Sequence, residues 1–437
     1  MKNHIKDQSS ILTKLGIQEL NDMQKESARV IKSNKDLILL SPTGTGKTLA
    51  FLLPIIETLD ADSTEVQVLI VAPSRELAIQ IESVAREMGS GYKTNVVYGG
   101  RAIAKDKVDL QHNPAILIGT PGRIADHLRR ETFDSRKIKL LVLDEFDKSL
   151  EIGFEEDMRE IISELPKVEQ CILTSATDAI SIPSFVKLSD PSELNFLHDA
   201  NTGLKIKKII SPEKDKLHTL VKSIKHLGDH HMIIFCNFKD SIDRVSEFLS
   251  DHDIVHGSFY GGMEQKDRER ILIKFRNGTV KILLATDLAA RGLDVAEIQS
   301  IIHYHMPLRE QEFIHRNGRT ARMNKDGAAY VIMWKDDEVP HFLKDCEEEI
   351  LERHEQDVAQ PEWATIFISG GRRDKISKGD IVGMILKQTT VSKEELGLIE
   401  LKPDCAFVAI SKHKVKHVIN TLNNTFLKKR KIRVNQI

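Results

Sequence analysis

Residues 36–59 read DLILLSPTGTGKTLAFLLPIIETL, and the architecture of the chain can be worked out from this stretch. An apolar run ends abruptly at Ser41, a string rich in glycine and threonine follows, and an apolar helical stretch begins at Thr48. The first run is apolar throughout rather than alternating, which is typical of a strand buried on both faces of a parallel sheet. The stretch therefore predicts a strand–loop–helix unit of an α/β domain.

The same unit recurs along the chain. Further apolar runs end in polar strings: QVLIVA before PSRELA, AILIG before TPGR, LLVL before DEFD, and CILT before SAT. The polar residues 188–205 predict a linker. A second series follows, with HMIIFCNF, VKILLATD, IQSIIHYHMP and GAAYVIMW. We therefore predict two parallel-sheet α/β domains in tandem, over residues 1–200 and 206–350, with ligands at the carboxyl ends of the strands.

The C-terminal part of the chain differs in pattern and in charge. We expect a charged helical segment over residues 337–356. Residues 362–437 then read as strand–helix–strand–strand–helix–strand, the order of a small α+β RNA-recognition module. This tail has 15 Lys and Arg against 7 Asp and Glu, whereas the rest of the chain is acidic. A basic tail on an acidic body indicates either attachment to a polyanion or a merely solvated surface.

Composition argues against a membrane protein, a secreted protein and a thiolate metal site. The longest apolar runs are strand-sized, well short of the roughly 20 residues of a membrane span, and the start, MKNHIKDQSS, lacks the apolar region of a secretory signal. Four scattered cysteines form no CxxC pair, which favours reduced thiols over thiolate-bound metal. We expect a cytoplasmic monomer that does not contact a membrane.

The string SPTGTGKT (41–48) matches a phosphate-binding loop, except that Ser41 replaces the first glycine. Backbone N–H groups between Gly44 and Gly46 can point inward, and the helix that follows presents its N-terminus to phosphate. Lys47 would neutralise charge on the β- and γ-phosphates, and Thr48 would bind Mg²⁺. The residues expected to line this nucleotide site are Thr43, Gly44, Thr45, Gly46, Lys47 and Thr48.

An NTPase of this kind also needs an acid for the metal and a base that positions water. The string LLVLDEFD offers Asp144 for the metal and Glu145 for the water, although three acids can also be a solvated turn after a strand. Farther along, HRNGRTAR carries Arg316, Arg319 and Arg322. These arginines suit a polyphosphate and could act as arginine fingers; the alternative is an exposed basic helix.

In this order, the strings resemble the DEAD-box family of superfamily 2 RNA helicases. The resemblance covers about residues 16–322 and includes GIQELNDMQ (16–24), Gly99–Gly100 and the EQKDR string that contains Arg268. It implies two RecA-like domains, ATP and Mg²⁺ as cofactors, RNA as partner, and RNA-dependent ATP hydrolysis that separates RNA strands.

The resemblance also implies roles for single residues. Nucleotide contacts and hydrolysis are implied for Gln24, which reads adenine, and for Lys47, Thr48, Asp144, Glu145, Gly292, Asp294, Arg319 and Arg322. Coupling of the ATP site to RNA is implied for Asp147, Ser175 and Thr177. RNA backbone contacts are implied for Arg75, Gly99, Gly100, Thr120, Arg123, Arg268 and Thr286.

The basic tail is similar to the RNA-binding domain of the DbpA/YxiN group, which recognises a hairpin of large-subunit ribosomal RNA. Basic side chains expected to bind RNA there are Arg372, Arg373, Lys375, Lys428, Lys429 and Arg430. Phe367 and Phe407 could stack on bases or belong to the core. The function implied is strand separation in ribosome assembly. The alternatives are a general RNA-remodelling helicase of cold shock or RNA decay, and a non-catalytic, ATP-gated RNA clamp.

Two departures from the family pattern bear on these expectations. LNDMQ replaces the usual proline-containing string before Gln24, which weakens the case for strict adenine selection. Phe146 stands where the family usually has alanine. We predict that its ring turns away from the nucleotide into the core, where its neighbours must leave room for it.

Overall fold

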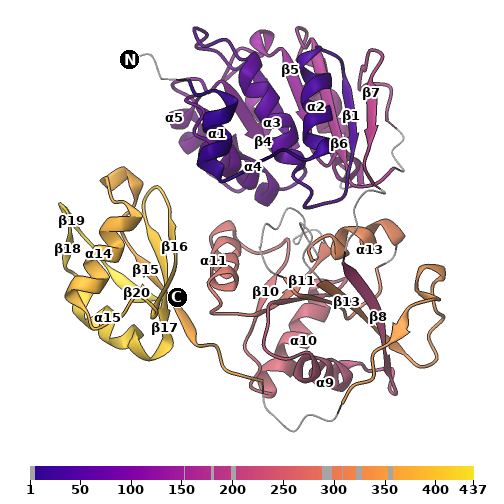
Figure 1. Cartoon of the computed structure of the whole chain (residues 1–437), viewed down its shortest axis with the longest axis vertical. Coiled ribbons are helices and arrows are strands. Elements are labelled where there is room, and N and C mark those ends of the chain that lie inside the picture. Colours follow the sequence, from indigo (N-terminus) through magenta and orange to yellow (C-terminus); the bar gives the residue numbers. More distant parts are fainter. Residues whose placement is uncertain are drawn as a thin grey trace. The chain divides into compact units, whose positions relative to one another are not determined.

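The computed structural model of the protein (Figure 1) describes residues 5–151, 153–178, 182–197, 203–287, 298–307, 309–320, 327–352 and 358–437. These residues divide into two units, one ending at Gly203 and the other running from Leu204 to Ile437. In Figure 1 the first unit is coloured from indigo to magenta and the second from pink to yellow.

The first unit is built on a parallel sheet with the strand order β3-β4-β2-β5-β6-β1-β7. Its strands are β1 (Leu37–Leu40), β2 (Val68–Val71), β3 (Thr94–Val97), β4 (Ile116–Gly119), β5 (Leu140–Leu143), β6 (Gln170–Ser175) and β7 (Ser192–Asn195). Its helices are α1 (Gln8–Leu15), α2 (Asp22–Lys32), α3 (Lys47–Thr58), α4 (Arg75–Met88), α5 (Ile103–Asp109), α6 (Pro121–Arg129), η1 (Ser135–Lys137), α7 (Phe146–Glu151) and α8 (Glu155–Ser163).

The central strands of this sheet are buried on both faces, as their unbroken apolar runs predict. In β2, Val68 and Ile70 belong to one hydrophobic cluster, while Leu69 and Val71 belong to another. Successive side chains of a strand point to opposite faces, so the two clusters are the cores on either side of the sheet.

The predicted linker over residues 188–205 is wrong in part, because Ser192–Asn195 forms β7 beside β1. Asp36 attaches this segment: its carboxylate accepts hydrogen bonds from the backbone N–H groups of Cys171 (2.7 Å) and Ser189 (2.6 Å). Its own carbonyl accepts from Ser192 N–H (2.8 Å). A polar, half-exposed segment can form an edge strand when the neighbouring strand supplies its hydrogen bonds.

The second unit contains a second parallel sheet with the order β10-β11-β9-β12-β13-β8-β14. Its strands are β8 (Leu204–Ser211), β9 (Met232–Phe235), β10 (His256–Phe259), β11 (Ile282–Ala285), β12 (Ser300–His303), β13 (Gly327–Trp334) and β14 (Glu347–Glu348). Its helices are α9 (Leu217–Leu227), α10 (Lys239–Asp251), α11 (Gln265–Arg276), α13 (Glu310–Asn317) and η2 (His341–Leu343).

The helix predicted over residues 337–356 is wrong for the described part of that segment. After the short η2 turn, Glu347 and Glu348 pair with the lysines of β8 as strand β14. Glu349 then forms a salt bridge to Lys207 (2.5 Å) and contacts His226 (2.9 Å). Pairing with a lysine-bearing strand therefore outweighs the helical propensity of an isolated glutamate run.

The C-terminal sheet is antiparallel, with the order β16-β17-β15-β20. Its elements are β15 (Trp363–Ile368), η3 (Arg372–Asp374), α14 (Lys378–Gln388), β16 (Leu396–Leu401), β17 (Ala406–Ser411), η4 (Lys412–Lys414), α15 (Val415–Leu422) and β20 (Val434–Gln436). A hairpin of β18 (Phe426–Leu427) and β19 (Arg430–Lys431) precedes the last strand. The predicted fold class is confirmed: two parallel-sheet α/β domains and a small α+β module. No helix in the described part of the chain is long and apolar enough to cross a membrane.

Candidate functional site

The loop between β1 and α3 has the conformation that phosphate binding needs. Gly44 (φ +88°) and Gly46 (φ +91°) lie in the left-handed region that favours glycine. A Cβ on Gly46 would come within 2.6 Å of the Gln24 amide nitrogen. Gly46 also occupies the N-terminal cap position of α3, so the N–H groups of the first helical turn face the space above the loop.

Hydrogen bonds within this loop account for Ser41 in place of the first glycine. The Ser41 hydroxyl bonds the Thr45 hydroxyl (2.7 Å), and the Ser41 N–H donates to the Ser175 carbonyl (3.0 Å). The Lys47 ammonium donates to the carbonyls of Ser41 (2.5 Å) and Pro42 (2.9 Å). Ser41 thus ties the phosphate loop both to itself and to the end of β6.

Gln24 lies against the same loop. Its side-chain oxygen accepts from Asn21 N–H (3.1 Å), while the Asn21 side chain accepts from Gln24 N–H (2.9 Å), a capping box that starts α2. The Gln24 amide nitrogen donates to the Gly46 carbonyl (3.4 Å), and the Asn21 amide donates to Thr45 (3.1 Å). The segment LNDMQ, without the usual proline, therefore still places Gln24 beside the phosphate loop.

Asp144 and Glu145 follow β5 and are both buried. The Thr174 hydroxyl donates to Asp144 (2.5 Å) and accepts from the Glu145 N–H (3.1 Å). Burial, and secondly the neighbouring Glu145 carboxylate, raise the pKa of Asp144 to about 6. Glu145 has φ +46°, a conformation that non-glycine residues seldom adopt and that often marks a functional site. The alternative of a solvated turn does not fit buried carboxylates.

These groups suit a magnesium ion. A buried carboxylate beside a second acid, such as Asp144, is stabilised by a cation, and Mg²⁺ prefers oxygen ligands. The half-buried Thr48 offers a hydroxyl from the first turn of α3. Among the described residues, no group of three or more His, Cys, Asp or Glu side chains could hold a metal. Mg²⁺ needs only one or two protein oxygens when phosphates and water complete its shell.

The three residues predicted to couple the ATP site to RNA lie together. Asp147 is 3.5 Å from the Thr177 hydroxyl, across the ends of the neighbouring strands β5 and β6. The Ser175 hydroxyl donates to the Thr177 carbonyl (2.8 Å) and accepts from its N–H (3.0 Å). All three side chains are buried, so they are closely packed where the two strands end.

Phe146 points away from this polar group, as predicted. Its ring is fully buried in the hydrophobic cluster on one face of the first sheet, with Ala125, Met158 and Leu173 among the members. The left-handed backbone at Glu145 turns the chain between the strand and α7. Neighbouring residues of this string therefore face either the site or the core.

The first-unit residues expected to bind RNA meet at the carboxyl ends of β2, β4 and β3, which are neighbours in the sheet. Arg75 starts α4, and a Cβ on Gly100 would lie 2.7 Å from its guanidinium. A Cβ on Gly99 would lie 3.6 Å from the same Arg75 guanidinium. Thr120 occupies the N-terminal cap position of α6, whose third residue is Arg123. The structure thus brings all five residues to one edge.

Asp106 is a residue of this edge that sequence reasoning missed. Its fully buried carboxylate pairs with Arg123 (3.2 Å) and Arg101 (3.3 Å), and it contacts His127 (3.3 Å). Arg123 also donates to the Tyr98 carbonyl (3.1 Å). Asp106 therefore holds Arg123 in place. It occurs in the ordinary charged string AIAKDKVD, which carries no signal of this role.

In the second unit, the side chain of Arg268 reaches from α11 to the carboxyl end of β10, and Thr286 follows β11. Arg268 donates to the Tyr260 carbonyl (3.1 Å), and its guanidinium stacks over the Phe259 ring at 4.5 Å. The Thr286 N–H donates to the Phe259 carbonyl (3.3 Å). The two residues expected to bind RNA are therefore neighbours.

The arginines of HRNGRTAR separate in role. Arg316, at the end of α13, is buried and donates twice to Asp287 (2.5 Å each) and once to Asn237 (2.8 Å), which makes it a structural residue. Arg319 is also buried, and it follows the end of α13. Three residues expected at the nucleotide lie outside the described residues: Gly292, Asp294 and Arg322.

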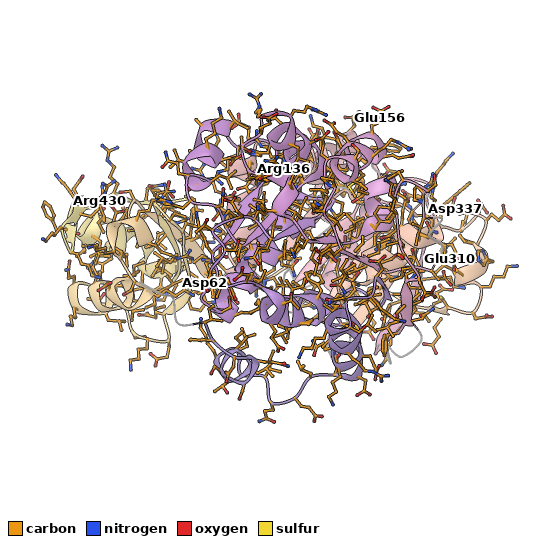
Figure 2. All side chains as sticks on the ribbon, turned by 90° about the horizontal axis from the view of Figure 1, so that it is seen from above. Asp62, Arg136, Glu156, Glu310, Asp337 and Arg430 are labelled. Carbon is orange, nitrogen blue, oxygen red and sulfur yellow. The ribbon has the colours of Figure 1, made fainter. Side chains whose placement is uncertain are left out.

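The basic residues of the C-terminal module gather from two segments. Lys428 of the hairpin donates to the Lys375 carbonyl (2.6 Å) and pairs with Asp380 (2.6 Å), while Arg430 is 3.7 Å from Asp374. Figure 2 shows the Arg430 side chain at the surface. The resulting basic patch consists of the exposed residues Arg372, Arg373, Lys375, Lys428, Lys429 and Arg430.

Phe367 and Phe407 lie outside the main hydrophobic cluster of the C-terminal module, although Phe407 is itself buried. They are cross-strand partners with ring centroids 5.6 Å apart, on the sheet face opposite the core residue Ile366. Thr365 on the same face is fully buried and hydrogen-bonds the Asn277 side chain (3.3 Å), just after α11 in the same unit. This face therefore contacts protein, at least at Thr365.

Comparison with known proteins agrees with the sheets and motifs. Residues 21–182 match the DEAD/DEAH box helicase family, residues 215–324 the helicase conserved C-terminal domain, and residues 365–436 the DbpA RNA binding domain. The ATP-dependent RNA helicase DbpA of Bacillus subtilis (strain 168) is 30% identical over 459 residues, which cover 97% of this chain and 95% of that protein.

Two further relatives support the same assignment. The ATP-dependent RNA helicase CshA of Listeria monocytogenes is 34% identical over 362 residues, covering 82% of this chain and 69% of that protein. A solved structure of S. cerevisiae Dbp5 bound to RNA and ADP BeF3 is 27% identical and has a TM-score of 0.68, covering 76% of this chain and 88% of that one. A likeness that extends through both parallel sheets and the C-terminal module shows that this chain belongs to the DEAD-box family of ATP-dependent RNA helicases, among the members with a DbpA-type RNA-binding domain.

Proposed function

We propose that the protein uses ATP binding and hydrolysis to separate short RNA duplexes during assembly of the large ribosomal subunit. The observation that carries the proposal is the continuous path from the phosphate loop through Ser41 and Ser175 to Asp147. The working domains would be residues 1–200 and 206–350 for the RecA-like core, and 362–437 for RNA attachment. The cytoplasmic location and the monomeric state remain predictions from the sequence.

In the proposed reaction, Thr48 and Asp144 would hold Mg²⁺, which neutralises phosphate charge when it is bound. Glu145 orients the attacking water and accepts its proton. Lys47 exchanges its contacts with the loop carbonyls for the β- and γ-phosphates. Arg319 stabilises the charge that develops on the transferred phosphoryl group, and Arg322 is proposed to act with it.

Three further groups would bind the nucleotide or RNA. Gln24, Gly292 and Asp294 are proposed to contact ATP. The edge formed by Arg75, Gly99, Gly100, Thr120 and Arg123 would bind the RNA backbone, as would Arg268 and Thr286 in the second RecA-like domain. Glycine N–H groups and helix N-termini contact phosphates and not base edges, and the arginines of these places are proposed to bind phosphate as well, so binding there should be independent of sequence. Specificity is then left to the C-terminal module.

We propose that the basic patch binds large-subunit ribosomal RNA. Six exposed cations from two adjacent segments suit the phosphates of a folded RNA. The test is to compare ATP hydrolysis stimulated by large-subunit ribosomal RNA with that stimulated by an unrelated RNA of equal length. A much lower half-saturating concentration of ribosomal RNA is expected. Equal values would favour the general RNA-remodelling helicase.

The non-catalytic clamp is tested by Glu145→Gln. The variant keeps the shape of the side chain and loses the base, so RNA-dependent phosphate release should fall by at least about a hundredfold. Binding of ATP and RNA should persist. Unchanged phosphate release would show that Glu145 is not the base and would leave the clamp as the better description.

A further inference from the structure

Phe238 is a large apolar residue that the folded chain leaves in solvent. It follows β9 by three residues and its side chain is 64% exposed. It also occupies the position that caps the N-terminus of α10, where it makes no side-chain hydrogen bond. Ser, Thr, Asp and Asn are preferred at such positions because their oxygen accepts from the first turn. Neither packing nor capping explains a phenylalanine here, and positions that break a local rule are often functional.

The surroundings of Phe238 are cationic and aromatic. Strands β10, β11 and β9 are adjacent in the second sheet, so Tyr260, Thr286 and Phe238 follow neighbouring strand ends. The ammonium of the exposed Lys239 lies 5.5 Å from the centre of the Tyr260 ring. Arg268 donates to the carbonyl of that same tyrosine (3.1 Å). The exposed ring therefore stands at the edge proposed above to bind the RNA backbone.

We propose that Phe238 is a stacking platform for one base of single-stranded RNA, with Lys239 neutralising an adjacent phosphate. This inference rests on the proposed RNA-binding edge of the second RecA-like domain. Proteins that bind single strands combine basic groups along the backbone with aromatic rings under the bases. Because every base has a π-face, the contact adds affinity without adding sequence preference.

A protein partner is the less favoured occupant of this surface. The described neighbours of the ring along the chain, Asn237, Lys239 and Asp240, are polar, and the last two are exposed. The central part of a protein interface is usually apolar and depleted of charge. A single ring bordered by polar and charged residues, with Lys239 next to it, matches a nucleic-acid base better than an apolar protein surface.

The test uses the full chain and three substitutions: Phe238→Thr, Phe238→Leu and Phe238→Trp. Affinity is measured by fluorescence anisotropy for an unstructured RNA 12-mer with a non-hydrolysable ATP analogue, and for the same strand carrying one abasic site at each position in turn. Loss of one stacked base should weaken binding about tenfold. Wild-type protein should bind about tenfold more weakly when the abasic site is at one particular position of the strand. The Phe238→Thr variant should bind the intact strand about tenfold more weakly than the wild type does.

The pattern across variants identifies stacking. Phe238→Thr should be insensitive to the abasic site that weakens the wild type, Phe238→Trp should retain wild-type affinity, and Phe238→Leu should behave like Phe238→Thr. Since threonine can cap α10, a loss of affinity cannot be ascribed to unfolding if the melting temperature is maintained. Full affinity in Phe238→Thr or Phe238→Leu would overturn the proposal and favour a protein partner. Absence of any wild-type RNA binding would instead contradict the proposed function.

Discussion

At Phe146 an aromatic ring stands between two acidic residues of the ATP site without belonging to that site. The ring is fully buried in the core on one face of the first sheet. Sequence alone predicts that the ring faces the core, because the acids on either side of it must face the ATP site. It cannot predict which helices leave room for the ring, since Ala125 and Met158 come from separate elements.

We expect Phe146→Ala to lower the free energy of unfolding by about 3–5 kcal/mol, the usual effect of truncating a buried phenylalanine. RNA-stimulated ATP hydrolysis, measured below the lowered melting temperature, should stay within about threefold of wild type. Phe146→Leu serves as control and should recover most of the stability. A well-folded alanine variant with strongly reduced turnover would mean that the ring acts in catalysis.

Asp144 gives a prediction about pH. Its folded-state pKa, about 6, lies above the ordinary 3.8, so the folded protein holds the proton more tightly than the unfolded chain. Stability of the nucleotide-free protein should therefore fall as pH rises through roughly 4 to 6, by about 2–3 kcal/mol. Asp144→Asn should abolish this dependence and raise the melting temperature at pH 7.5, while ATP hydrolysis is lost. A melting temperature at or below that of wild type would contradict the assigned pKa shift.

At the scale of elements, central and edge strands differ in how well sequence predicts them. Central strands such as β2 and β5 are apolar throughout, so their pattern is unambiguous. The edge strands β3 (TNVV) and β10 (HGSF) were missed because one or both faces are only partly buried. The edge strand β7 was mistaken for a linker. An edge strand forms because a neighbour supplies hydrogen bonds, which is information from another part of the chain.

Asp36 is the residue that attaches β7. We expect Asp36→Ala to destabilise the first unit by about 1–3 kcal/mol, because two buried N–H groups lose their acceptor. Hydrogen exchange of residues 189–196 should accelerate more than that of β2. Asp62, an exposed residue labelled in Figure 2, offers the control: Asp62→Ala should leave both rates unchanged. Uniform acceleration would show that Asp36 stabilises the whole unit and not β7 in particular.

At the scale of the molecule, the second unit joins the second parallel sheet to the C-terminal module. Arg276 of α11 forms a two-pronged ion pair with Glu400 of β16, at 2.6 and 3.0 Å. Burial acts to raise the pKa of the Glu400 carboxyl, but Arg276, helped by Lys402, brings that pKa below its ordinary value. Together with the contact between Thr365 and Asn277, this pair fixes the face of the sheet that carries Phe367 and Phe407.

We expect Arg276→Glu to release the C-terminal module, because it places two carboxylates together at a partly buried position. The loss should be on the order of 2 kcal/mol. It should appear as faster proteolytic cleavage between β14 and β15. The double variant Arg276→Glu with Glu400→Arg restores the pair and should restore protection. Equal protection in the single variant and the wild type would mean that the pair does not hold the module.

The sequence by itself determined the two parallel sheets, the phosphate loop, the acidic strand end and the order of the C-terminal module, because each depends on a local pattern of apolar, glycine and charged residues. Tertiary structure alone decided that Thr174 bonds Asp144, that Asp106 holds Arg123 and that Arg316 is committed to Asp287. It also left Phe238 exposed next to Lys239, whose ammonium lies over the Tyr260 ring. These contacts join residues far apart in the chain or depend on what surrounds a side chain. The local pattern of the sequence predicts neither.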